Sequence, residues 1–256
     1  MKRAGNNSCG YDLTDRIRHS WMGFHVERVA TPATYELVSE QIRRAIHIGT
    51  YLPGDKLPAE RQLAEQMGVS RTTVREALRV LEGEGYVESH RGAAGGIVVL
   101  DQTSSEERIR PVVMARMAEF EELFDFRIAV EGAAVRLAAV RRTETDLKQL
   151  QKALDAMAEG WQTARFRAAD SAFHLGIADA ARNRFMRQAI EDARAEMWIP
   201  IDPQIDVVFR TANRHHEEIL QAIRNRDPDA AERAAVAHLK TARRDLRRVA
   251  RTDEPA

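Results

Sequence analysis

The chain has 256 residues, which by ordinary domain sizes is enough for two domains. Its composition, with 44% hydrophobic, 6% aromatic and 30% charged residues, is typical of a helical protein with aliphatic cores. Basic and acidic residues both number 39, so any affinity for nucleic acid must come from local clusters of basic side chains. The single cysteine, Cys9, excludes a disulfide framework and a cysteine zinc site. The sequence has no apolar run of the ~18 residues that cross a bilayer and no signal-peptide pattern, so we expect a cytoplasmic protein without membrane contact.

The N-terminal part of the chain divides into an irregular segment and a helical one. Residues 1–30 show no sustained period and are expected to form a disordered extension. A helix is expected over residues 32–48, because Thr31 can cap it, Pro32 suits its first turn and apolar residues follow at helical spacing.

Two further helices are expected close together in the sequence. A short helix ends at Gly68, and a third runs over residues 70–84 with Ser70 as its N-cap. Residues 86–89 and 97–99 then read as two strands around the glycine-rich stretch 91–96. Three helices followed by a β-hairpin predict a winged helix-turn-helix over residues 31–100.

Beyond this domain the sequence has helical periodicity almost throughout. The polar residues 101–108 are expected to be a linker, residues 109–250 an antiparallel all-α bundle and residues 251–256 a tail. The helices are expected at 120–141, 144–160, 163–180, 183–199, 205–225 and 228–250. Thr143 with Asp146 resembles a capping box, and Asp227 followed by Pro228 is expected to be an N-cap. The predicted fold class is therefore mainly α, with an N-terminal winged helix-turn-helix and a C-terminal helical bundle.

The third helix has the features of a DNA-recognition helix. Its N-terminal end enters a major groove in such motifs, and Arg71 and Arg75 stand one turn apart on the face opposite its apolar stripe. Hydroxyl side chains beside them suit phosphate oxygens, and the glycines of the wing permit close approach to the backbone of double-stranded DNA. Taken one at a time, these arginines could equally be ordinary solvated surface residues. The expected contacts are Arg61, Ser70, Arg71, Thr72, Thr73, Arg75, Arg91 and Gly92.

A long motif in this region resembles a known family. Residues 51–64 read Tyr-Leu-Pro-Gly-Asp-Lys-Leu-Pro-Ala-Glu-Arg-Gln-Leu-Ala, and residues 68–78 read Gly-Val-Ser-Arg-Thr-Thr-Val-Arg-Glu-Ala-Leu. This pattern resembles the N-terminal domain of the GntR family of transcription regulators, and the helical half resembles the ligand-binding domain of its FadR-like branch. The resemblance implies a homodimer that reads a short palindromic operator and that a small carboxylate metabolite releases.

Histidines in the second half suggest a metal site. Asp170 and His174 are four residues apart and share one helix face, while His216 and His238 lie near apolar stripes of two other predicted helices. One carboxylate and three imidazoles suit a divalent ion such as zinc, nickel or manganese. Spacing alone does not show that the four converge, and each histidine could instead be a hydrogen-bonded residue with no metal.

The family resemblance also bears on this site. The strings at 170–177, 216–220 and 238–239 are similar to those of the metal-binding branch, which implies Asp170, His174, His216 and His238 as ligands. His215 points about 100° away from His216 around a helix, so only one of them can face a shared core, and the resemblance selects His216. Arg127 matches the position of an effector-binding arginine, although a surface ion pair with Glu131 is an alternative.

These patterns favour a non-enzymatic regulator whose affinity for its operator, as repressor or activator, depends on a carboxylate bound at the metal site. A metal-dependent hydrolase fused to a DNA-binding domain is a rival, but the sequence contains no nucleophile motif and no glycine-rich phosphate loop. A metal that only braces the bundle is a third alternative. A carboxylate titration would separate the last two, because a bracing metal leaves DNA affinity unchanged.

Overall fold

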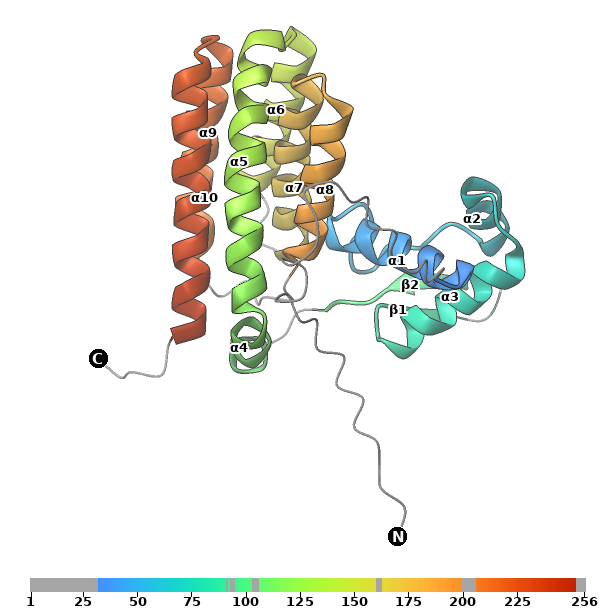
Figure 1. Ribbon diagram of the computed structural model, residues 1–256. Coiled ribbons are helices and arrows are strands. Elements are labelled where there is room, and N and C mark those ends of the chain that lie inside the picture. The colour runs from blue at the N-terminus through green and yellow to red at the C-terminus, as the bar shows by residue number, and fades with distance from the viewer. Residues whose placement is uncertain are drawn as a thin grey trace, which may run out of the picture. The chain divides into compact units, whose positions relative to one another are not determined.

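The computed structural model describes residues 32–90, 92, 95–102, 106–159, 163–198 and 206–251, which contain ten helices and two strands (Figure 1). The expected extension at 1–30, the possible cap Thr31 and most of the expected tail lie outside these residues.

The winged helix-turn-helix is built from the elements that the sequence predicts. Helices α1 (Thr34–His47), α2 (Glu60–Met67) and α3 (Arg71–Gly83) precede strands β1 (Val87–His90) and β2 (Gly96–Val99). The strands pair antiparallel, from Val87 opposite Val99 to His90 opposite Gly96. The apolar stripes of the helices and one face of the hairpin share a core that includes Val38, Ile42, Leu63, Val74, Leu78, Leu81, Val87 and Val99.

The turn between α2 and α3 is short because both of its helix ends are capped locally. Gly68 ends α2 in the left-handed conformation, at φ 67°, and its N–H donates to the carbonyl of Ala64. Ser70 is the N-cap of α3, and its hydroxyl accepts a hydrogen bond from the backbone N–H of Thr73 at 3.0 Å. Only Val69 lies between the two caps, which fixes the angle at which α3 leaves the turn.

The second half of the chain is a bundle of long helices. They are α4 (Glu106–Ala115), α5 (Met117–Arg141), α6 (Glu144–Glu159), α7 (Thr163–Ala180), α8 (Arg184–Glu196), α9 (Asp206–Arg224) and α10 (Pro228–Arg251). Two or three residues join α5 to α6, α7 to α8 and α9 to α10, and connections this short favour antiparallel neighbours. In Figure 1, α5 and α10 lie side by side along most of their length, and they pack closely.

The expected caps in the bundle are present. Thr143 and Asp146 form a reciprocal capping box at the start of α6, with backbone N–H to side-chain distances of 2.7 and 3.3 Å. The carboxylate of Asp227 accepts from the backbone N–H of Ala230 at 2.9 Å, directly before α10.

Helix α4 is a difference from the sequence-based expectation. It begins at Glu106, inside the stretch expected to be a linker, and it contains Pro111. Charged residues and an internal proline obscure its helical period, but Val113 is fully buried against Phe120 and Leu246. Packing against α5 and α10 therefore decides this helix, whereas its local sequence does not.

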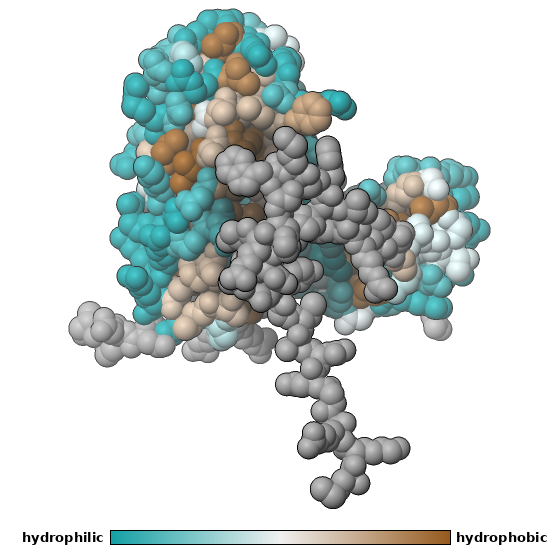
Figure 2. All heavy atoms as spheres, viewed as in Figure 1, coloured by the Kyte–Doolittle hydropathy of each residue, from teal (hydrophilic) through white to brown (hydrophobic). Residues whose placement is uncertain are grey.

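The bundle core lies where α5, α6, α7, α9 and α10 meet. Its fully buried members include Phe173, Ile219 and Ile223. A Cβ atom at Gly176 would lie 3.0 Å from Leu150 Cδ2, so this glycine lets α7 approach α6 closely. In the described part of the chain, none of the helices is long and apolar enough to cross a membrane, and the face seen in Figure 2 is mostly hydrophilic with small hydrophobic areas.

Candidate metal centre and nucleic-acid interface

Three helices bring together the four residues that the sequence proposes as metal ligands. Asp170 and His174 lie one turn apart on α7, His216 lies on α9 and His238 on α10. One nitrogen or oxygen atom from each residue lies within 4.8 Å of the corresponding atoms of the other three. The fold thus converts four separated sequence positions into one cluster.

The distances within the cluster are close to those between ligands of one ion. His216 Nε2 lies 3.3 Å from Asp170 Oδ1 and 3.4 Å from His174 Nε2, and His174 Nε2 lies 3.7 Å from Asp170 Oδ1. Metal bonds of about 2.0–2.2 Å place neighbouring ligand atoms roughly 3–4 Å apart. The residues therefore fit a divalent metal.

The protonation states of the cluster also suit a metal. Burial lowers the pKa of His216 to about 3 and the pKa of His238 well below its ordinary value, so both imidazoles are neutral. Burial alone would raise the pKa of Asp170, but Arg194 and the three histidines outweigh it and lower that pKa. Neutral imidazoles and an ionised carboxylate are the forms that bind metals.

The four candidate ligands differ in their exposure. The three histidines are almost completely buried, whereas the Asp170 side chain retains 20% of its exposure. Next to His174, a cavity of about 10 Å³ lined mainly by aliphatic side chains has room for at most about one water. Of the four candidate ligands, Asp170 therefore lies nearest to solvent among the described residues.

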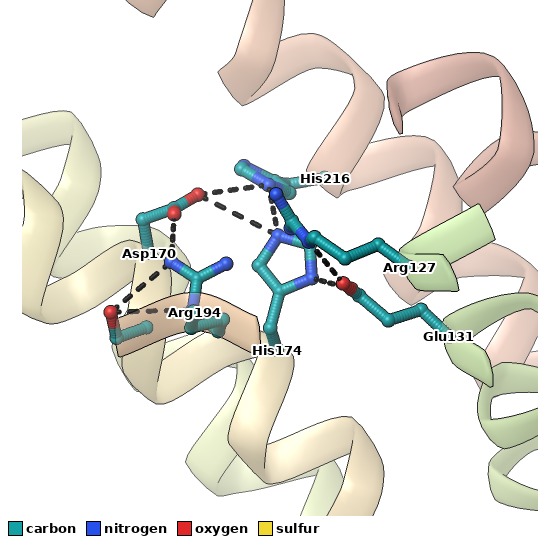
Figure 3. A network of polar contacts seen from close by, with 7 residues as sticks. Arg127, Glu131, Asp170, His174, Arg194 and His216 are labelled. Atoms are coloured by element: carbon teal, nitrogen blue, oxygen red, sulfur yellow. Dashed lines mark hydrogen bonds and ion pairs between the residues drawn. The ribbon is translucent and has the colours of Figure 1, made fainter. Parts of the chain in front are cut away.

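Two charged residues of the site were not predicted from the sequence. Arg194 on α8 donates to the Asp170 carboxylate and, at 3.1 and 3.3 Å, to the Ser171 hydroxyl (Figure 3). Glu131 on α5 accepts a hydrogen bond of 2.6 Å from His174 Nδ1. Neither α8 nor α5 carries a candidate metal ligand. The two residues are therefore identified only by the position of their side chains beside the cluster.

Arg127 combines features of both sequence-based interpretations. It forms the expected ion pair with Glu131, through Nε at 2.6 Å, but the pair is buried and the alternative of a surface pair is wrong. Figure 3 shows the guanidinium of Arg127 beside His174 and His216. Its two terminal amino groups have no hydrogen-bond acceptor among the described residues, which leaves donors available for a ligand.

His215 is buried as well, although helix geometry predicts that only one of the two adjacent histidines faces the shared core. Its ring packs edge-on against His238, with the centroids 6.0 Å apart, while His216 faces Asp170 and His174. Helix α9 is covered by the bundle on more than one face, so two directions about 100° apart both lead inward. His215 lies outside the cluster of four candidate ligands.

The proposed DNA-reading residues lie at the exposed start of α3 and on α2. Arg71 and Thr72 are exposed, and Ser70 and Thr73 hold each other through their hydroxyl groups at 2.9 Å. Arg75 donates from Nε and Nη2 to the two carboxylate oxygens of Glu60 at 3.1 and 2.7 Å.

The remaining positions have different environments. Arg61 forms an exposed pair with Glu65 at 2.9 Å. Gly92 adopts φ 104° and is exposed in the wing, while Arg91 lies outside the described residues.

Comparisons with known proteins agree with both halves of this architecture. Residues 34–98 match the gntR family of bacterial regulatory proteins, and residues 122–241 match the FCD domain. The Exu regulon transcriptional regulator of Escherichia coli K12 is 33% identical over 214 residues, 80% of this chain and 81% of its own length. The Uxu operon transcriptional regulator of the same strain is 31% identical, covering 86% of this chain and 89% of its own.

A solved structure supports the fold. Escherichia coli McbR/YncC superimposes with a TM-score of 0.52 at 21% identity, covering 85% of this chain and 99% of that protein. The chain thus belongs to the GntR family of bacterial transcription regulators and binds DNA, with an N-terminal winged helix-turn-helix and a C-terminal helical FCD domain.

Proposed function

We propose that the FCD domain of this regulator holds one divalent metal ion and binds a small carboxylate there, which changes the affinity of the chain for its operator. The observation that carries this proposal is the convergence of Asp170, His174, His216 and His238. A bound ion with these four ligands would retain net positive charge and leave room for an anionic ligand. The metal would supply a Lewis-acidic centre for the oxygens of that ligand.

Two arginines support a carboxylate as the ligand. Arg127 and Arg194 both reach the cluster, and their charges are matched by Glu131 and Asp170. Because these two arginines and two carboxylates cancel each other's charge, an added divalent ion makes the site positive, and a positive site favours an anion. The terminal amino groups of Arg127, which have no acceptor among the described residues, suit bidentate hydrogen bonds to a carboxylate.

Regulation requires that the carboxylate binds one arrangement of the protein better than another. A ligand with equal affinity for both would leave DNA binding unchanged. The family resemblance also implies a homodimer and a palindromic operator, which we include in the proposal. The sign of regulation stays open, and the relatives include a protein named as the Glc operon transcriptional activator of Escherichia coli K12.

The test uses full-length protein, freed of any histidine tag, and DNA selected from a random-sequence pool. DNA affinity is measured with zinc-loaded and metal-stripped protein while acetate, lactate, glycolate and citrate are titrated. We expect at least one of these acids to change the affinity of the zinc-loaded protein by fivefold or more, the scale of ordinary allosteric coupling. Wild-type protein that binds none of zinc, nickel and manganese would overturn the metal site.

A purely structural metal is the second candidate, and the burial of the ligands favours it. His174, His216 and His238 are at most 6% exposed, and an ion here would tie α7, α9 and α10 together. In that case the metal stabilises the bundle, but carboxylates leave the DNA affinity of the loaded protein unchanged.

A further inference from the structure

Glu131 has both of its carboxylate oxygens engaged by different partners. Oε1 accepts from Arg127 Nε at 2.6 Å, and Oε2 accepts from His174 Nδ1 at 2.6 Å (Figure 3). The Glu131 and His174 side chains are 6% and 4% exposed, so water competes little for these hydrogen bonds. The rotamer of Glu131 is thereby fixed from two directions.

The contact with Glu131 determines how His174 presents itself to the cluster. An ionised carboxylate can only accept, so the hydrogen of a neutral His174 ring lies on Nδ1. The lone pair then lies on Nε2, the atom that faces Asp170 Oδ1 at 3.7 Å and His216 Nε2 at 3.4 Å. The ring is therefore already in the form and direction that a metal requires.

The other two histidines of the cluster have no such partner in the described part of the chain. The Nδ1 atoms of His216 and His238 are buried and make no hydrogen bond to any described residue. Among the described residues, a carboxylate holds the second nitrogen of His174 and of neither other ring.

We propose that Glu131 is a positioning residue for metal binding, which holds His174 in its metal-binding tautomer and orientation and connects it to Arg127. The inference rests on the proposed metal site and extends it to a residue that binds no metal itself. Carboxylates behind metal-bound histidines fix the ring and raise its basicity, and their loss typically weakens metal binding by about 10–100-fold. Because Arg127 shares the same carboxylate, a ligand that moves Arg127 also disturbs the support of His174.

The first experiment measures zinc affinity by competition with a chromogenic chelator. We expect Glu131→Ala to bind zinc about 10–100-fold more weakly than the wild type. Glu131→Gln should lose less, because its amide oxygen still accepts from Nδ1 of His174. Glu121→Gln is the matched control, since Glu121 also lies on α5 and pairs with arginines, Arg243 and Arg247, but away from the cluster.

The second measurement needs no substitution. Long-range ¹H–¹⁵N correlation spectra of zinc-loaded wild-type protein report which ring nitrogen of each histidine carries hydrogen, and the His174→Gln spectrum assigns the signals of His174. We expect hydrogen on Nδ1 and zinc on Nε2.

The outcomes separate the two proposals. Wild-type protein that binds no divalent metal overturns the metal site itself, and Glu131 loses its role with it. Wild-type protein that binds zinc, with folded Glu131→Ala and Glu131→Gln variants within threefold of its affinity, overturns only the role of Glu131. If these variants fail to fold, the spectrum decides, because zinc on Nδ1 of His174 contradicts the proposal and zinc on Nε2 supports it.

Discussion

Arg71 and Arg75 lie one turn apart at the start of α3, yet their surroundings differ. Both side chains are exposed, but Arg75 is held by both oxygens of Glu60. The hydrogen bond from Arg75 is the main reason that the pKa of Glu60 is lowered, so Glu60 is ionised at neutral pH. An exposed pair of this kind contributes little to stability, but it directs the guanidinium of Arg75.

We predict that Arg71→Ala and Arg75→Ala each weaken specific DNA binding by about 1–3 kcal/mol if they contact bases. A residue that contacts only phosphate should instead flatten the salt dependence of binding. Fluorescence anisotropy at several salt concentrations, with DNA selected from a random pool, measures both effects. Arg233→Ala, an exposed change on α10, serves as the control. If both variants on α3 bind like the wild type, α3 is not the recognition helix.

His215 and His216 provide a matched pair of substitutions, because both are buried neighbours on α9. We expect His216→Ala to lose most of its bound metal, since its Nε2 faces the other ligands, and His215→Ala to keep about one ion per chain. Elemental analysis of tag-free, zinc-loaded protein measures this. Equal losses in the two variants would contradict the assignment of His216 as the ligand.

Individual helices of this protein are fixed by their ends and by their partners. Helix α6 starts with a capping box that the sequence alone predicts, and Arg182 adds an ion pair to Asp146 at 2.6 Å. Helix α4 has no comparable local signal, and the burial of Val113 holds it in place. The two helices show that capping and packing can each determine an element.

We predict that Asp146→Asn lowers the free energy of unfolding by about 1 kcal/mol at pH 7, the usual effect of losing a cap. Burial alone would raise the pKa of Asp146, but hydrogen bonds from Thr143 and Arg182 lower it below 3.8. Because the pKa of Asp146 is lower in the folded than in the unfolded chain, its ionisation stabilises the folded state. This stabilisation is complete at pH values above the unfolded pKa and is lost as the pH falls through the folded pKa. Urea denaturation should therefore show a constant difference from pH 7 to pH 5 that shrinks below about pH 4. A difference that grows on acidification would contradict this explanation.

The whole bundle should respond to the metal, because its candidate ligands come from α7, α9 and α10. At a free zinc concentration 100 times the Kd, binding to the folded state adds about 2.7 kcal/mol of stability. For a chain of this size we expect the melting temperature to rise by roughly 5–10 °C. Thermal denaturation followed by circular dichroism measures this rise. The same zinc should leave the melting temperature of His216→Ala nearly unchanged, and an equal rise there would indicate binding elsewhere.

The sequence by itself determined most of the elements of this protein, though not α4, and its family. Helical periods, the Ser70 and Thr143 caps and the motif at residues 51–78 act over a few residues, so they can be read along the chain. The four candidate ligands could also be named, but only because the resemblance selected Asp170 and three of the eight histidines.

Only the tertiary structure decided which side chains meet. Spacing along one helix could not reveal that Arg194 comes from α8 to Asp170, or that Glu131 comes from α5 to His174. The same limit applies to Arg127, whose pair with Glu131 is correctly spaced on one helix but whose burial depends on its neighbours. Burial, and with it the strength of a charge and the direction of a pKa shift, is set by the elements packed around a residue, and local sequence does not encode that packing.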